Sequence, residues 1–194
     1  MQRKSILLAC ISLWVCATAT IQAEDKMFPE FSHYPATVTS GPFSQTLVLT
    51  NEQIKYSAHW KKTMQQQLVK PVNFAGHYRF FATDAYQGDE CQHGICGWVL
   101  DKSTGNVVSN LPEFNGSDSY GAVGDNGTPV GEPFETKTQS DSLLLILTGQ
   151  AIPKELKHDK DGVPITNPCE TNYYKFENNK FIRIFEDRNG CNVD

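Results

Sequence analysis

The chain has 194 residues, of which 39% are hydrophobic and 11% aromatic, and its 17 basic and 22 acidic residues give a net charge of −5. This length fits one domain with a real core and excludes a large multidomain machine. The acidic balance argues against a general nucleic-acid-binding protein, which would normally present a basic face. Beyond residue 23 no stretch approaches the ~18 apolar residues of a membrane span. The sequence contains no nucleotide-binding loop, zinc-protease helix or serine-hydrolase elbow.

Residues 1–23 have the features of a secretory signal peptide. Two basic residues precede an uncharged apolar stretch, and Ala23 ends a small-residue cleavage site. A membrane anchor and a lipidated leader cysteine are alternatives, but the apolar stretch is short and no positive flank follows it. We therefore expect a single mature domain over 24–194 in the periplasm or outside the cell. Cleavage would remove Arg3 and Lys4, which makes the mature chain more acidic.

Four cysteines lie beyond the leader. They allow three pairings, and an oxidising compartment favours disulfides over a metal site. Proximity in the chain favours Cys91–Cys96 and Cys169–Cys191. Zinc is the alternative, but four residues with His93 among them separate Cys91 from Cys96, which is not a usual zinc-ribbon spacing. We expect no metal and no cofactor.

The first predicted element after an aromatic-rich lead-in and a short strand over 46–50 is a helix. Thr50 and Gln53 have the spacing of a capping box, and Pro71 would stop the helix after residue 68. Apolar side chains recur at helical spacing on one face: Trp60, Met64 and Leu68, with Ile54 near the same stripe.

The remaining elements are predicted to be antiparallel strands. Residues 77–111 predict a three-stranded meander, 134–148 a hairpin, and 173–186 a second hairpin turning at 178–179. The continuous apolar run at 143–147 is typical of a central strand covered on both faces. The expected fold class is α+β, a mainly antiparallel sheet of about six or seven strands with one N-terminal helix packed on it.

Two long polar loops interrupt these strands. Residues 112–133 form a loop that contains five glycines and three prolines. This loop is longer than the ~12–15 residues expected of a passive connection, which points to a function. Residues 149–170 form the second loop. Extending the register of the last hairpin would place Cys169 opposite residue 188, near Cys191.

The segment Asn73-Phe74-Ala75-Gly76-His77-Tyr78 is distinctive, and several motifs follow it in order: a cysteine hairpin, Leu100-Asp101, Thr104-Gly105, Leu111-Pro112, Ser140-Asp141-Ser142-Leu143-Leu144, and Tyr173 to Phe181. In that order they resemble a family of small secreted bacterial proteins with an Asn-Phe-Ala-Gly-His-Tyr-like motif. The resemblance covers roughly residues 50–186. It implies architecture and a secreted location but no reaction, since the family has no established activity. The chain departs from the family at the cysteine hairpin, which is longer here than the compact Gly-Cys-Gly-x-Gly-Cys form.

His77 is the candidate for catalysis. A histidine titrates near neutrality and can act as a general base, here with Asp84 or Asp101 as the carboxylate partner. The structural alternative is that Asn73 hydrogen-bonds its own turn and His77 caps the end of the sheet.

The Cys91–Cys96 loop is the first candidate binding surface. A cross-linked, charged tip suits insertion into a partner's cleft, although it can also be a simple solvated hairpin tip. In the 112–133 loop, Tyr120 is the expected aromatic anchor. The predicted binding residues are His93, Asp89, Glu90, Tyr120, Asp118 and His77.

Residues 159–170 have part of a calcium-loop pattern. Acidic residues stand at the first and twelfth positions, but Pro164 replaces the glycine that the sixth position requires, and no helix is expected beside it. A polar turn is therefore preferred.

We expect a non-enzymatic periplasmic binding protein, for instance an inhibitor or immunity protein acting on a cell-wall-directed enzyme. Such enzymes are often basic, and opposite charge speeds association. Its partner would be another protein, with no nucleic acid and no membrane after cleavage. The alternative is a small periplasmic hydrolase using His77 with a nearby carboxylate. A pocket holding that pair would favour the hydrolase, and a protruding loop would favour the binding protein.

Overall fold

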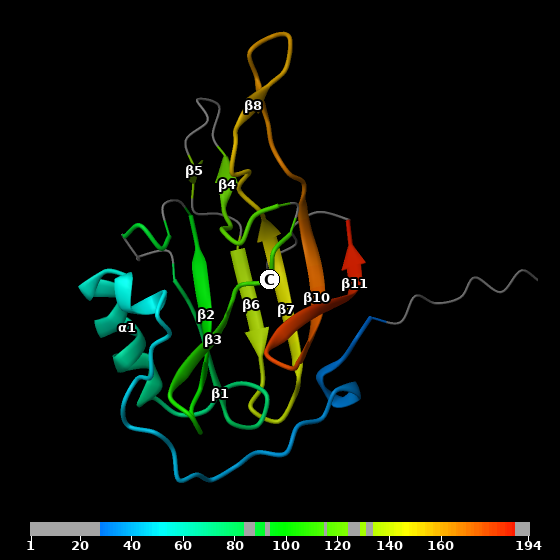
Figure 1. Ribbon diagram of the computed structural model, residues 1–194. Coiled ribbons are helices and arrows are strands. Elements are labelled where there is room, and N and C mark those ends of the chain that lie inside the picture. Colours follow the sequence, from blue (N-terminus) through cyan, green and yellow to red (C-terminus); the bar gives the residue numbers. More distant parts are fainter. Residues whose placement is uncertain are drawn as a thin grey trace, which may run out of the picture.

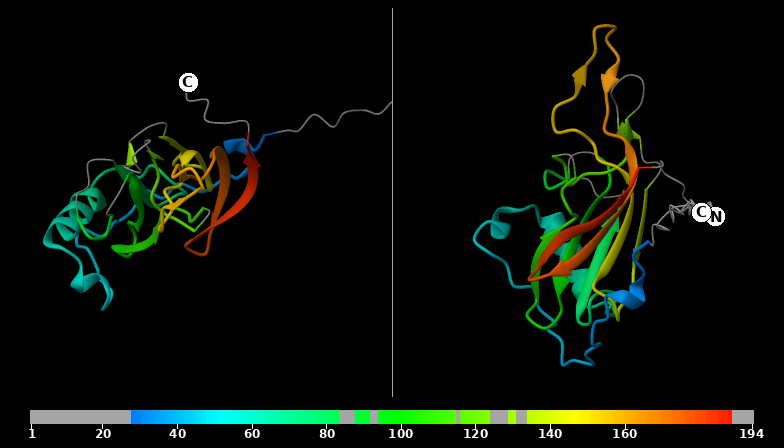
Figure 2. Two further views of the ribbon diagram at one scale, coloured as in Figure 1. Left: turned by 90° about the horizontal axis from the view of Figure 1, so that it is seen from above. Right: turned by 90° about the vertical axis from the view of Figure 1, so that its right-hand side faces the viewer.

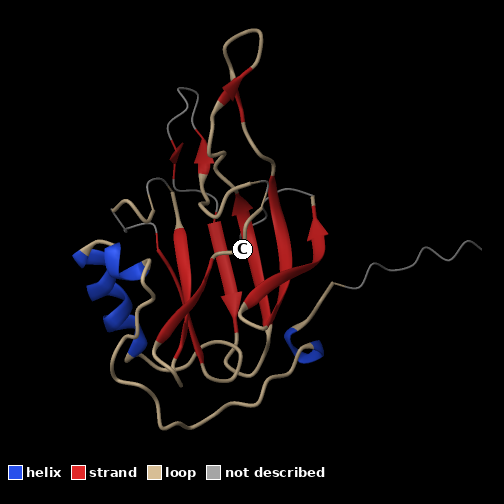
Figure 3. Ribbon diagram, in the orientation of Figure 1, coloured by secondary structure: helices blue, strands red, loops and turns tan. Residues whose placement is uncertain are grey.

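A computed structural model describes residues 28–83, 88–91, 94–114, 116–123, 129–130 and 134–188. The predicted leader, Asp84, His93 and Cys191 lie outside the described residues. The described chain forms one α-helix, two short 3-10 turns and eleven strands (Figure 3). Seven strands build two antiparallel sheets, ordered β1-β2-β3 and β11-β10-β7-β6. The predicted α+β class and the number of main strands are confirmed.

The N-terminal helix begins later than predicted. The predicted capping box is present. The Gln53 N–H donates to Thr50 Oγ1 at 3.2 Å, and the Thr50 N–H donates to Gln53 Oε1 at 3.1 Å. It caps only the 3-10 turn η2 (Gln53–Lys55), after which Tyr56 is extended with ψ 161°. A second cap then starts α1 (Ala58–Leu68), where the hydroxyl of Ser57 accepts from a backbone N–H of the first turn.

Helix α1 covers the outer face of the first sheet (Figure 1). Its buried stripe is the predicted one, with Trp60, Met64 and Leu68 at most 1% exposed. These side chains pack on Trp98 and Leu100 in a separate core cluster. Ile54 was predicted near the stripe and is 55% exposed, because it precedes the helix.

The first sheet is the predicted meander of β1 (Tyr78–Thr83), β2 (Cys96–Asp101) and β3 (Asn106–Asn110). Every residue of β2 is buried, since α1 covers one face and the main core covers the other. The predicted strand over 46–50 is reduced to one bridge, between Val48 and Asn106.

The second sheet contains β6 (Phe134–Thr138), β7 (Leu144–Gln150), β10 (Cys169–Glu177) and β11 (Lys180–Asp187). Strand β7 is central, as predicted, between β10 and β6. Strands β10 and β11 turn at Asn178-Asn179, whose φ angles of 51° and 60° suit asparagine.

A bulge corrects the predicted register of the last hairpin. Glu177 pairs with Lys180 as expected, but the pairing shifts between Tyr173 and Tyr174. Thr171 consequently lies opposite Asp187 rather than residue 186. The bulge shifts the pairing by one position, so the register without a bulge that placed residue 169 opposite residue 188 does not hold.

Two small ribbons extend from the sheets: β4 (Ala122–Val123) with β5 (Pro129–Val130), and β8 (Lys157–His158) with β9 (Pro164–Ile165). The β8–β9 ribbon projects from the body of the molecule (Figures 1 and 2). It lies within the predicted polar loop 149–170, to which the structure adds these two short strands.

The main core lies between the two sheets, which are joined at both ends. At one end, Tyr120 exchanges backbone hydrogen bonds with Ile95 at 2.6 and 2.9 Å, while the Gly121 N–H donates to Gln150 O at 2.8 Å. At the other end, the Gly76 N–H donates to Ser140 O at 2.7 Å. The distinctive motif at 73–78 is therefore the structural link between β1 and the β6–β7 turn.

Candidate functional site

The structure brings three predicted binding residues to one hollow. Asp89, Glu90 and Asp118 line a cavity of about 290 Å³, which we call the acidic hollow. Asp89 is exposed, and the other two are half-buried. The rest of the lining comes from the disulfide, the chain at 117–119 and the residues that lead to the projecting ribbon: Cys91, Ser117, Ser119, Ile152, Pro153 and Lys154.

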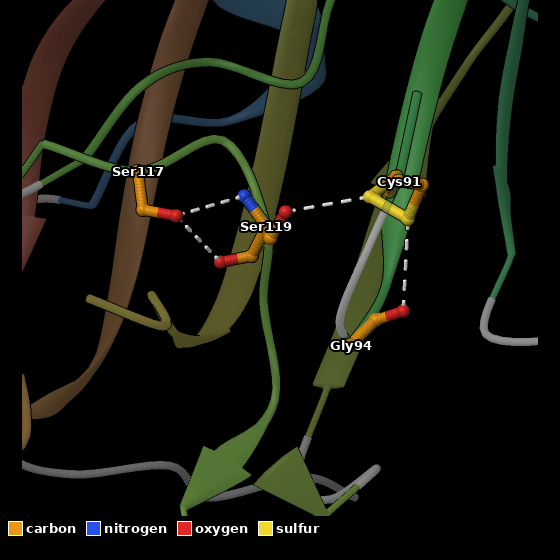
Figure 4. The surroundings of a disulfide bond; sticks show 5 residues. Cys91, Gly94, Ser117 and Ser119 are labelled. Atoms are coloured by element: carbon orange, nitrogen blue, oxygen red, sulfur yellow. Dashed lines mark hydrogen bonds between the residues drawn. A yellow bond between two sulfur atoms is a disulfide. The ribbon is translucent and has the colours of Figure 1, made fainter. Parts of the chain in front are cut away.

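Cys91 lines this hollow and is bonded to Cys96. Figure 4 shows this disulfide with Ser117 and Ser119 beside it. Its Cα atoms are 6.0 Å apart, which confirms the predicted pairing. The Ser119 hydroxyl lies 3.4 Å from Cys96 Sγ and must be the donor, because a disulfide sulfur carries no hydrogen. The Ser119 N–H donates to Ser117 Oγ at 3.1 Å, which orders the facing wall.

The described ends of the disulfide loop are packed against the rest of the protein, and the predicted tip is not among the described residues. Gly94 has φ 70°, and a Cβ there would lie 2.2 Å from Tyr120 O. Cys91 and Cys96 are only 5% and 6% exposed. The described part of the loop thus folds back on the junction between the sheets and forms a concave wall. His93 lies outside the described residues.

Glu90 fixes this wall to the helix. Its carboxylate accepts from the Ser57 N–H at 2.5 Å and from the Ser57 hydroxyl at 3.1 Å. Asp89 and Glu90 also border a second cavity of about 360 Å³, on the side of Tyr56 and Trp98. The pair is therefore an acidic ridge between two hollows, with Asp89 more exposed than Glu90.

Tyr120 was predicted to be a surface anchor, and that prediction is wrong. The side chain is 0% exposed, and its hydroxyl donates to Pro112 O at 2.5 Å. Burial, together with Tyr174 and Asp118, holds the pKa of Tyr120 far above its ordinary value. The backbone at Tyr120 and Gly121 can be buried because its bonds to Ile95 and Gln150 satisfy the polar groups.

His77 is placed by the end of the first sheet. Its Nε2 lies 3.6 Å from Asp101 Oδ1, just beyond hydrogen-bond distance. That oxygen already accepts from the backbone N–H groups of Ser103 and Thr104, at 2.8 and 3.3 Å. Neither His77 nor Asp101 lines the acidic hollow or the cavity beside it.

Asn73 has a structural role, but its side chain bonds to β1 and not to its own turn as predicted. Its side-chain amide donates to Phe80 O at 3.0 Å, and its carbonyl accepts from the Phe80 N–H at 2.8 Å. The residue therefore mimics a strand partner at the start of β1.

Strand β10 carries a buried polar row that was not predicted from the sequence. Glu170 and Asn172 are 1% and 0% exposed on the core side, and Glu170 Oε2 has no hydrogen-bond partner among the described residues. Burial, with the neighbouring carboxylate of Glu186, raises the pKa of Glu170 to about 7. A hydrogen bond from Arg188 holds the pKa of Glu186 below its ordinary value. The alternation of buried and less buried residues along a strand would have placed Glu170 and Asn172 on the core face, but the strand was predicted to begin at 173 and it begins at 169.

Within the described residues, no cluster of three or more histidine, cysteine or acidic side chains has the arrangement of a metal site. The calcium-like segment is a polar turn, in which Asp159 Oδ1 accepts from the N–H groups of Asp161 and Val163, both at 2.9 Å. Cys169 is disulfide-bonded, and its predicted partner lies outside the described residues.

None of the helices in the described part of the chain has the length and apolar character needed to cross a bilayer.

Comparison of the chain with models of known protein families, with curated proteins and with solved structures finds no match. The class that the fold and the site define is an α+β protein with a disulfide-walled acidic hollow. The resemblance to the small secreted family stays a prediction.

Proposed function

We propose that this chain is an exported binding protein whose acidic hollow receives a basic side chain of another protein. The observation that carries the proposal is that Asp89 and Asp118, from separate segments, line one hollow beside a disulfide. Two carboxylates at one concave surface favour a lysine or arginine. Lys154, the basic residue of the lining, lies 3.5 Å from Glu113 outside the hollow.

The walls of the hollow are held before a partner arrives. The disulfide, the Glu90 cap on Ser57 and the close approach of Gly94 to Tyr120 each restrict the Asp89 side of the site. A surface ordered in advance loses less conformational entropy on binding.

The β8–β9 ribbon supplies a projecting contact surface next to the hollow. Ile152, Pro153 and Lys154 line the hollow and lead directly into the ribbon. On the ribbon, Val163 and Ile165 are 56% and 54% exposed. Exposed aliphatic side chains beside a charged hollow suit a protein partner better than a small molecule.

The proposed partner is a basic enzyme that acts on the cell wall, with this chain as its inhibitor or immunity protein. The full chain has a net charge of −5, and loss of Arg3 and Lys4 with the leader would make it more acidic. Such a charge would speed association with a basic enzyme. The predicted leader would export this chain to the compartment in which cell-wall enzymes act. N-terminal sequencing of the exported protein should begin near Glu24, and a retained Met1 would contradict export by cleavage.

The test compares wild type with the double variant Asp89→Asn/Asp118→Asn as bait for a periplasmic extract, with mass spectrometry of the captured proteins. Basic cell-wall hydrolases should be retained by wild type and lost by the variant. Asp141→Asn/Glu177→Gln is the matched control, because it removes two exposed charges away from the hollow. Equal capture by all three proteins would overturn the proposal.

Association kinetics with a purified muramidase of high isoelectric point give a second measurement. The association rate constant of the hollow variant should fall about tenfold relative to the control at low salt, and the difference should shrink as salt increases. Equal rate constants for the two variants would contradict a role for the hollow.

A further inference from the structure

A second hollow lies on the outer face of the four-stranded sheet and shares no residue with the acidic hollow. Its volume is about 260 Å³. Ile146 and Thr148 form part of its floor, and they alternate along β7 with Leu145 and Leu147 of the main core. The lining comes from all four strands of the sheet and from the lead-in segment at Phe28.

One wall of this sheet-face hollow is aromatic. The ring of Phe28 lies 6.2 Å from that of Tyr173 and 5.4 Å from that of Phe185, measured between centroids. Tyr173 and Phe185 are also in edge contact at 5.4 Å. Phe28 is 46% exposed, so much of its ring remains open to solvent beside the hollow.

The rest of the lining presents hydrogen-bonding groups. The hydroxyls of Thr148 and Thr171 share one hydrogen bond at 2.9 Å, which leaves a hydroxyl hydrogen and lone pairs for another partner. Lys137 Nζ lies 3.1 Å from Glu135 Oε2 at the β6 edge. Asp187 lines the hollow from β11, on the other edge of the sheet.

We propose that the sheet-face hollow binds one pyranose ring of a neutral glycan. A pyranose has an apolar C–H face, which suits the aromatic wall, and a rim of hydroxyls that both donate and accept. Thr148 and Thr171 can do both, Lys137 donates, and the carboxylates accept. Two carboxylates and one ammonium make the lining net negative, which disfavours phosphorylated or sulfated ligands.

This inference is independent of the proposed protein partner, because the two surfaces share no lining residue. A chain with both sites would hold a protein and a glycan at once.

The test is a titration of the ¹⁵N-labelled protein with N,N′,N″-triacetylchitotriose, followed by amide chemical shifts. The shifts should change at Thr148, Thr171 and Tyr173, with a dissociation constant of about 1 mM for a single-ring contact. Thr148→Val/Thr171→Val removes both hydroxyls while keeping β-branched strand residues, and should weaken binding at least tenfold. Thr136→Val is the matched control, since it lies on the other face of β6 from Glu135 and Lys137.

Three outcomes would overturn the proposal. The first is the absence of shift changes in a folded protein at about 20 mM trisaccharide, well above the expected constant. The second is a set of changes confined to the acidic hollow. The third is equal affinity of the double valine variant and the Thr136→Val control. If the double variant does not fold, Lys137→Gln, at an exposed position, should weaken binding about threefold, and unchanged affinity would count against the site.

Discussion

Glu90 caps the residue that itself caps helix α1. Its two carboxylate oxygens accept from the N–H and the hydroxyl of Ser57, at 2.5 and 3.1 Å. The Ser57 hydroxyl in turn accepts from the Trp60 N–H at 3.1 Å. This chain of bonds ties the disulfide loop to the start of the helix, and through Trp60 to the core beneath it.

Replacing Glu90 should therefore destabilise the fold as a whole. We expect Glu90→Ala to lower the free energy of unfolding by about 1–3 kcal/mol, because two donors at the helix start lose a charged acceptor. Urea unfolding at pH 7 measures this. Asp89→Asn is the control and should change stability by less than about 0.5 kcal/mol, as for an ordinary surface position. Equal effects of the two changes would show that the cap is unimportant.

Alanine substitutions at Gly94 and Gly116 should distinguish the cost of a steric clash from the cost of backbone strain. Their φ angles are similar, at 70° and 80°, but a Cβ at Gly94 would meet Tyr120 O at 2.2 Å, whereas nothing lies within 4 Å at Gly116. Gly116→Ala should cost about 1 kcal/mol from strain alone. Gly94→Ala should cost at least about 2 kcal/mol more, measured by thermal unfolding. Similar melting temperatures would show that the loop does not pack on Tyr120.

Tyr120 should behave as a core residue. Tyr120→Phe keeps the ring but leaves the buried Pro112 O without its donor, so we expect a loss of about 1 kcal/mol in unfolding free energy. Tyr120→Ala should cost about 3–5 kcal/mol. Tyr78→Phe is the matched control, since its hydroxyl bonds to Asn179 at the surface and should contribute little. A Tyr120→Ala protein of wild-type stability would contradict the burial.

Glu170 should make stability fall as the pH rises. Its pKa is about 7 in the folded protein and near 4.5 when unfolded, so its stabilising contribution is complete below pH 4.5 and is lost through pH 7. The pKa of Glu186 is lowered instead of raised. Glu186 is therefore ionised throughout the range above pH 6 and adds no slope there. Arg188, the cation beside both carboxylates, remains charged.

Between pH 6 and 8, the wild-type protein should therefore lose roughly 1 kcal/mol of unfolding free energy, once solvent screening is allowed for. Glu170→Gln should show no such slope, whereas the exposed Glu177→Gln should keep it. Urea unfolding at both pH values measures the difference. A slope that persists in Glu170→Gln would assign the titration to another group.

The second disulfide stays a prediction. Cys169 is disulfide-bonded, and the bulge in the last hairpin changes the register that led us to Cys191. Peptide mapping without reduction should recover Cys169 joined to Cys191. Recovery of Cys169 joined to any other cysteine would refute the pairing.

Elements with a local pattern were predictable from the sequence. The stripe of Trp60, Met64 and Leu68 and the asparagine turn depend on neighbours within a few residues, where period and turn chemistry dominate. The meander follows from the strand pattern of consecutive segments. The start of α1 was missed because two capping patterns follow one another, and the first closes only a 3-10 turn.

The sequence by itself determined the fold class, the Cys91–Cys96 bridge and the acidic character of the candidate residues, because composition, proximity and short-range pattern control these properties. Only the tertiary structure decided that Tyr120 is buried, that Gly94 packs on it, and that Asp89, Cys91 and Asp118 line one hollow. Each of these depends on the junction where Tyr120 pairs with Ile95 and Gly121 with Gln150. Backbone hydrogen bonds between distant segments carry no side-chain signature, so the sequence could not place that junction.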